Sequence, residues 1–134
     1  MPKQADELIQ TARTLIQERY QKDGHHSVVA AAIRTTTGKI YTALNAGTYQ
    51  PSIATCAEII AIGMANTLEK DFQIDMIVAV RDASGYVISP CGKCREYIAD
   101  YGPNAKVILP ADNTAGYKVM PIQKLLPNKY VKKA

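Results

Sequence analysis

The placement of the three cysteines constrains this chain more than any other feature, because all of them fall in two short segments. Cys56 lies in a Thr-Cys-Ala-Glu run, whereas Cys91 and Cys94 share the run Ser-Pro-Cys-Gly-Lys-Cys. An odd number of cysteines argues against a self-contained disulfide framework. In a chain of cytoplasmic character, such clustering favours a metal site or a catalytic site. The fold is therefore expected to bring these two distant segments together.

Hydrophobic patterning predicts alternating helices and strands. Apolar residues recur at helical spacing over 4–21, which indicates an amphipathic helix. The run from Thr55 to Leu68 is apolar on nearly all faces, as is typical of a helix buried against a sheet. Two more helices are expected, one from Pro90 or Cys91 to Gly102, a natural C-terminal cap, and one over 121–126. The predicted strands cover 28–33, 39–44, 75–80, 106–109 and 117–120.

This order of elements predicts a mixed sheet that is covered by helices on both faces. A length of 134 residues fits one domain over residues 1–134, large enough to bury a core. No apolar run approaches the ~18 residues needed to cross a bilayer. The polar N-terminal segment also lacks the apolar core of a signal peptide. We therefore expect a soluble, cytoplasmic protein with no membrane partner.

The net charge of +4 does not by itself indicate a nucleic-acid partner. Much of the excess lies toward the C-terminus, at Lys118, Lys124, Lys129, Lys132 and Lys133. No aromatic residues interleave with a basic stripe, so a solvated tail is favoured over a surface that binds nucleic acid.

The cysteine spacing suits a catalytic zinc. Cys91 and Cys94 are three residues apart at the start of a helix, so their thiols can point the same way. With Cys56 they would supply three ligands to Zn²⁺ and leave its fourth position open for water. Glu58 lies two residues after Cys56, close enough to act as a general acid–base on that water without binding the metal. The full pattern matches the signature of zinc deaminases, including its all-cysteine variant.

Two other interpretations of these residues stay open. Thr55 and Glu58 also fit a capping box, in which Glu58 would merely satisfy a backbone amide. That interpretation does not explain why all three cysteines lie where a zinc site needs them. Alternatively, His25 or His26 could supply a fourth ligand and close a purely structural zinc site, although paired histidines in a polar turn are more often exposed.

Taken together, the residues resemble the cytidine deaminase superfamily, most closely the small free-nucleoside members such as cytidine deaminases and blasticidin-S deaminases. The resemblance runs from Val28 to Tyr130. It includes the segments Ala-Ala-Ile-Arg, Cys-Ala-Glu, Ile-Val-Ala-Val-Arg and Ser-Pro-Cys-Gly. It implies an α/β fold, a three-layer α/β/α sandwich with a mixed five-stranded sheet, and a homotetramer with active sites at subunit boundaries.

The resemblance also implies roles for individual residues. Cys56, Cys91 and Cys94 would bind Zn²⁺, and Glu58 would transfer protons. Backbone groups at Ala57 and near Ser89 would hold the edge of the base. Asn45 falls where relatives place a sugar-binding asparagine. Tyr130 falls where a C-terminal aromatic residue reaches the base in a neighbouring subunit, but it could equally be an ordinary half-buried tyrosine.

The chain departs from the cytidine deaminase pattern near the expected sugar site. Gly47 stands where those enzymes carry a ribose-binding glutamate, and His26-Ser27 stands where they carry a phenylalanine. Ile59 replaces the arginine that follows the glutamate in all-cysteine members, so Lys93 and Arg95 are candidates to offset the charge of three thiolates.

The functional hypothesis is zinc-dependent hydrolysis of the 4-amino group of a free cytosine nucleoside, with blasticidin S, cytidine or deoxycytidine as the substrate. One alternative is a nucleic-acid editing deaminase that acts on cytosine or adenine, although the short chain offers no aromatic and basic groove. The other is a zinc-stabilised module without catalytic activity, which would bind metal tightly and release no ammonia.

Overall fold

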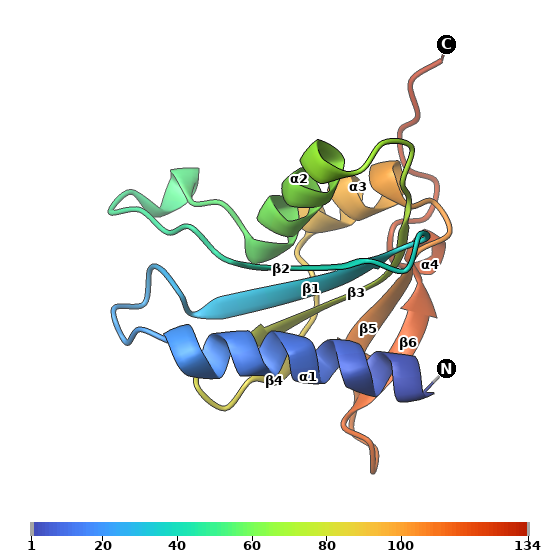
Figure 1. Cartoon of the computed structure of the whole chain (residues 1–134). Helices are drawn as coiled ribbons and strands as arrows, with labels where there is room; N and C mark the ends of the chain where they lie inside the picture. Colours follow the sequence, from blue (N-terminus) through green and yellow to red (C-terminus); the bar gives the residue numbers. More distant parts are fainter. Residues whose placement is uncertain (1, 134) are drawn as a thin grey trace.

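The computed structural model describes residues 2–133 and arranges them as a mixed sheet between two layers of helix (Figure 1). The regular elements in chain order are α1 (Pro2–Arg19), β1 (Val29–Thr35), β2 (Ile40–Leu44), a 3₁₀ turn (Pro51–Ile53), α2 (Ala57–Leu68), β3 (Ile74–Arg81), β4 (Tyr86–Ile88), α3 (Gly92–Tyr101), β5 (Lys106–Pro110), β6 (Tyr117–Pro121) and α4 (Ile122–Leu125). The α/β fold class and the order of helices and strands are as predicted.

The sheet runs in the order β2-β1-β3-β5-β6, and β4 pairs with β3 off this path. β1 is antiparallel to both β2 and β3, whereas β3 and β5 are parallel. All five predicted strands occur, and β4 is a sixth strand that the patterning missed. Three residues are too few to show an alternating pattern. β4 pairs with β3 after a turn in which Asp82 and Gly85 adopt left-handed backbone, with φ of 63° and 67°.

α1 covers one face of the sheet, seen below the sheet in Figure 1. Its buried stripe recurs every four residues, at Leu8, Ala12 and Ile16. It packs on residues of β1 such as Ala32 and residues of β3 such as Val78. This is the spacing at which side chains line one face of a helix. The amphipathic pattern of the sequence therefore specifies which face of α1 meets the sheet.

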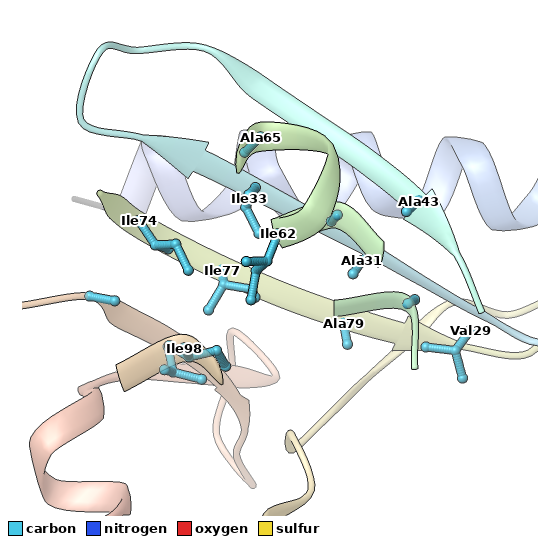
Figure 2. Close-up of a cluster of buried hydrophobic side chains, with 14 of the residues drawn as sticks. Val29, Ala31, Ile33, Ala43, Ile62, Ala65, Ile74, Ile77, Ala79 and Ile98 are labelled. Atoms are coloured by element: carbon cyan, nitrogen blue, oxygen red, sulfur yellow. The ribbon is translucent and has the colours of Figure 1, made fainter. Parts of the chain in front are cut away.

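α2 and α3 lie side by side on the opposite face (Figure 1). Figure 2 shows Ile33, Ile62 and Ile77 gathered between α2 and the sheet, within the larger of the two buried clusters. The sequence predicted burial of α2 on nearly all sides, but the chain covers only one face of it. Met64 is 38% exposed and Leu68 is 65% exposed, so the outer face of α2 leaves two large apolar side chains open.

Gly102 ends α3 for a different reason from the one predicted. Its backbone is extended, with φ of −161°, and is not in the left-handed conformation of a glycine cap. A Cβ atom at this position would lie 2.7 Å from the backbone oxygen of Ile74 and 2.8 Å from the Ile74 Cβ. Glycine is thus required because the chain after α3 passes directly against β3.

Gly102→Ala should destabilise the protein by about 1–3 kcal/mol, since backbone atoms of β3 must move to admit the methyl group. Gly63→Ala is the matched control, because Gly63 lies inside α2 and a Cβ there meets no atom within 4 Å. That control should be neutral or stabilise by up to about 1 kcal/mol. Urea unfolding measures both free energies. Equal effects of the two substitutions would contradict the close approach at Gly102.

Candidate metal centre and active site

The site forms where α2 and α3 begin. Cys56 is the N-cap residue of α2, and Cys91 is the N-cap residue of α3. Cys94 lies in the first turn of α3 and is fully buried. The three sulfur atoms lie within 4.8 Å of one another. Two segments that are far apart in the sequence therefore meet at one point, and helix N-termini favour the thiolate form that binds metal.

The donor set fits zinc. Three thiols are soft ligands of the kind that bind Zn²⁺, and three protein ligands leave the open position of a catalytic zinc. Among residues 2–133 no histidine nitrogen joins the sulfur cluster. His26 instead makes a hydrogen bond through Nδ1 to the carboxylate of Asp23. The structure therefore offers no histidine to close a four-ligand structural zinc site.

The environment of the thiols differs from one cysteine to the next. Burial raises the pKa of the Cys56 thiol, and burial together with the charge of Glu58 raises the pKa of the Cys94 thiol. Burial also acts on Cys91, but its pKa is lowered because the backbone amides of Cys94 and Lys93 donate hydrogen bonds to its sulfur. Without a metal, Cys56 and Cys94 hold their protons near neutral pH.

Glu58 lies in the first turn of α2 and is 4% exposed. Burial raises the pKa of its carboxyl group, although hydrogen bonds from its own amide and from Cys94 act in the opposite direction. Thr55 precedes the N-cap residue Cys56, and no side chain caps α2. The capping box is therefore absent, and the Glu58 side chain does not serve to cap the N-terminus of α2. A buried carboxyl with a raised pKa beside a metal cluster is typical of a general acid–base.

A cavity of about 300 Å³ opens beside the thiols. It brings together nearly all of the predicted site residues, namely Asn45, Cys56, Ala57, Glu58, Ser89, Cys91 and Cys94. Tyr130 is the exception, because it lies on the C-terminal tail and is 79% exposed. Within this chain the structure does not bring Tyr130 to the cavity.

Most of the hydrogen-bonding capacity of the Asn45 side chain is taken up by backbone groups in the wall of the cavity. Its Oδ1 accepts hydrogen bonds from the backbone amides of Val28 and Val29, each at 3.0 Å. Its Nδ2 donates to the carbonyl oxygen of His25 at 2.6 Å. The asparagine thus fixes the segment that leads into β1, and one hydrogen of Nδ2 is left for a ligand.

Gly47 has no room for a side chain. A Cβ atom there would lie 1.9 Å from the carbonyl oxygen of His25 and 2.3 Å from its carbonyl carbon. The backbone of His25 therefore occupies the space that a glutamate at position 47 would need. This contact gives a physical reason for the departure at Gly47 that the sequence shows.

The cavity is also lined by Gly24, His25, Arg81 and Ile88, which the sequence did not predict. Arg81 could have been predicted from the sequence, because it is a charged residue at the end of a strongly apolar strand. His25 was considered only as a metal ligand. The Arg95 guanidinium donates through Nε to the carbonyl of Pro90 at 2.9 Å and through Nη1 to that of Leu125 at 3.1 Å. It thereby fixes the loop before Cys91 against α4.

Comparison with known proteins agrees with this geometry. Residues 2–110 match the family described as the cytidine and deoxycytidylate deaminase zinc-binding region. Blasticidin-S deaminase of Bacillus cereus is 41% identical over 134 residues, which cover 94% of this chain and 91% of that protein. The cytidine deaminase structure from Burkholderia pseudomallei has a TM-score of 0.75 at 26% identity and covers 93% of this chain and 98% of its own. That from Mycobacterium leprae has a TM-score of 0.76 at 23% identity, with coverages of 92% and 97%.

The fold and the three-thiol site define a zinc-dependent hydrolytic deaminase. The chain belongs to the cytidine deaminase superfamily, and its reaction is the hydrolytic removal of a cytosine amino group. Neither the comparisons nor residues 2–133 favour a nucleic-acid editor or a non-catalytic module. No helix in that range is long and apolar enough to span a membrane.

Zinc binding should strengthen as the pH rises. The thiols of Cys56 and Cys94 have raised pKa values, so they are protonated near neutral pH and must release protons when metal binds. Each proton released adds about one decade of affinity per pH unit, so we expect these two thiols alone to contribute about two decades per unit near neutral pH. Competition with a chelator of known pH dependence measures this slope. Glu58→Gln should keep the slope, and a slope near zero would contradict thiolate ligation.

Proposed function

We propose that this chain is a deaminase of free cytosine nucleosides and that blasticidin S is its preferred substrate. The observation that carries the proposal is the enclosure of three thiols and one buried carboxyl in a single cavity of about 300 Å³. A cavity of this size suits a small molecule. The blasticidin-S deaminase of B. cereus, at 41% identity, supports the choice of substrate. So does Gly47, where a glutamate that could bind ribose has no space.

In this proposal Cys56, Cys91 and Cys94 hold the zinc ion. Zinc bound there would lower the pKa of a water molecule toward ~7 and so supply hydroxide near neutral pH. Glu58 accepts the proton that this water loses and donates it to N3 of the cytosine ring. The water oxygen adds to C4 of the ring. Glu58 then passes a second proton from that oxygen to the amino group, so that the C4–N bond breaks, ammonia leaves and the C4 carbonyl forms. Because Glu58 is buried, its carboxyl can hold a proton at a pH where an exposed glutamate would be ionised.

The base and the sugar are held by groups around the cavity. Backbone groups of Ala57 and Ser89 bind the edge of the cytosine, since both residues line the cavity next to the thiols. Asn45 acts at the sugar, mainly by fixing His25 and the start of β1 around it. A cytoplasmic setting, where thiols stay reduced, is part of the proposal.

Glu58→Gln should lower the rate of ammonia release by at least the ~10²–10⁴-fold typical of a general acid–base. Its zinc content should be unchanged, because Glu58 is not a ligand. Cys91→Ala is the contrasting control and should lose both zinc and activity. Ammonia release and the ultraviolet change of the pyrimidine, measured on blasticidin S, cytidine and deoxycytidine, give the readout. Retained activity in Glu58→Gln would exclude the proton-transfer role, and turnover of cytidine over blasticidin S would exclude the substrate preference.

The active enzyme is proposed to be a homotetramer in which Tyr130 of one subunit reaches the cavity of another. Met64 and Leu68 are exposed apolar side chains on the outer face of α2. Tyr130 and Val131 on the tail are 79% and 73% exposed. Exposed apolar side chains on these two segments support contacts with neighbouring subunits.

Light scattering should give four times the chain mass of 14.6 kDa. Tyr130→Ala should raise the KM more than Tyr130→Phe, which keeps a ring that can stack on the base. A monomer with full activity would contradict the shared site, as would equal KM values for the two Tyr130 variants.

A further inference from the structure

The mouth of the cavity has a different chemistry from its interior. Glu58 is the single carboxyl among the described residues that line it, and it is 4% exposed, deep in the protein. Arg81 lines the same cavity and has a side chain that is 44% exposed, so it lies at the mouth. It contributes the one permanent positive charge among those lining residues. His25 is the other basic residue in the lining.

The guanidinium of Arg81 has capacity to bind a ligand. Its Nε lies 3.7 Å from the carboxylate of Asp82, and both side chains are more than two-fifths exposed. An exposed ion pair of this kind is weak. Within residues 2–133 the terminal nitrogens of Arg81 make no hydrogen bond or ion pair. The rigid end of β3, paired with Val29 on one side and Tyr86 on the other, holds the backbone of Arg81 in place.

The wall that faces a ligand sugar offers no carboxylate acceptor. The backbone of His25 packs against Gly47, where a Cβ would lie only 1.9 Å from the His25 oxygen. That same oxygen already accepts a hydrogen bond from Asn45. Sugar hydroxyl groups are therefore not met by an acidic side chain here. Planar guanidinium groups, in contrast, suit carboxylates and phosphates, which accept paired hydrogen bonds.

We infer that the mouth of the cavity is an anion subsite in which Arg81, assisted by His25, binds a carboxylate or phosphate attached to the sugar of a cytosine nucleoside. This inference rests on the proposed deamination of cytosine nucleosides and deepens it. The subsite selects acidic nucleosides over neutral ones. Blasticidin S carries a carboxylate on its sugar ring, and deoxycytidine 5′-monophosphate carries a phosphate. Comparing each of these ligands with a neutral counterpart therefore distinguishes the two sources of negative charge.

The test compares each anionic ligand with its neutral counterpart. Binding of blasticidin S and of its methyl ester is measured by calorimetry on zinc-loaded Glu58→Gln protein, which prevents turnover. The pair deoxycytidine 5′-monophosphate and deoxycytidine is measured in the same way. Arg81→Gln and Arg81→Lys are added to the same background. Lys118→Gln is the matched control, because it removes one positive charge from an exposed position on β6 outside the cavity lining.

We expect the acid to bind about 5- to 20-fold more tightly than its ester, the range for a charged hydrogen bond at a partly exposed site. In Arg81→Gln this preference should fall to within about twofold, whereas Arg81→Lys should keep part of it and Lys118→Gln all of it. Added salt should reduce the preference. A preference for the phosphate over deoxycytidine that depends on Arg81 would also support the subsite and assign it to phosphate.

Equal affinities within both ligand pairs would overturn the anion subsite, even with deamination intact. A preference that survives in Arg81→Gln would overturn the assignment to Arg81. Failure of all four ligands to bind would overturn the proposed function together with the subsite. These three results differ from one another in the calorimetric data. Failure of the anion subsite is therefore distinguishable from failure of the proposed deamination of cytosine nucleosides.

Discussion

The meeting of the N-termini of α2 and α3 is the constraint on which the rest of the structure depends. Cys56 and Cys91 occupy the N-cap positions of these helices, and Cys94 follows one turn into α3. The sulfur atoms come within 4.8 Å because both helices pack on the same face of the sheet and contact each other. The buried isoleucines between the helices and β3 hold this arrangement (Figure 2). A shift of either helix along the sheet would separate the three sulfur atoms.

This arrangement places groups that prefer water inside the protein. Glu58 of α2 and Cys94 of α3 are both buried and interact with each other, and burial raises the pKa of each. The cost of burying them is partly offset when a cation binds, because thiolates and a divalent metal attract each other strongly in a medium of low polarity. The site and the stability of the fold are therefore linked through the metal.

Around this metal centre, the cavity is shaped largely by backbone atoms. Asn45 ties the 25–29 segment in place with three hydrogen bonds, and Gly47 lets the backbone of His25 lie where a side chain would otherwise stand. The cavity therefore has a compact wall on one side and Arg81 at its mouth. Under the proposed function, this wall contributes to specificity by what it excludes as much as by what it contacts.

The sequence by itself determined the order of elements, the stripe of α1 that meets the sheet, and the cluster of thiols with Glu58. These features are encoded locally, since helical spacing, strand composition and the interval between cysteines each lie within a short window. Only the tertiary structure decided the rest. β4 forms because β3 extends beyond its pairing with β5 and can pair there with a further strand. Gly102 is needed because β3 passes beside it, and Arg81 and His25 line the cavity because distant segments converge there. Such contacts depend on the positions of elements that are far apart in the chain, and no local pattern records them.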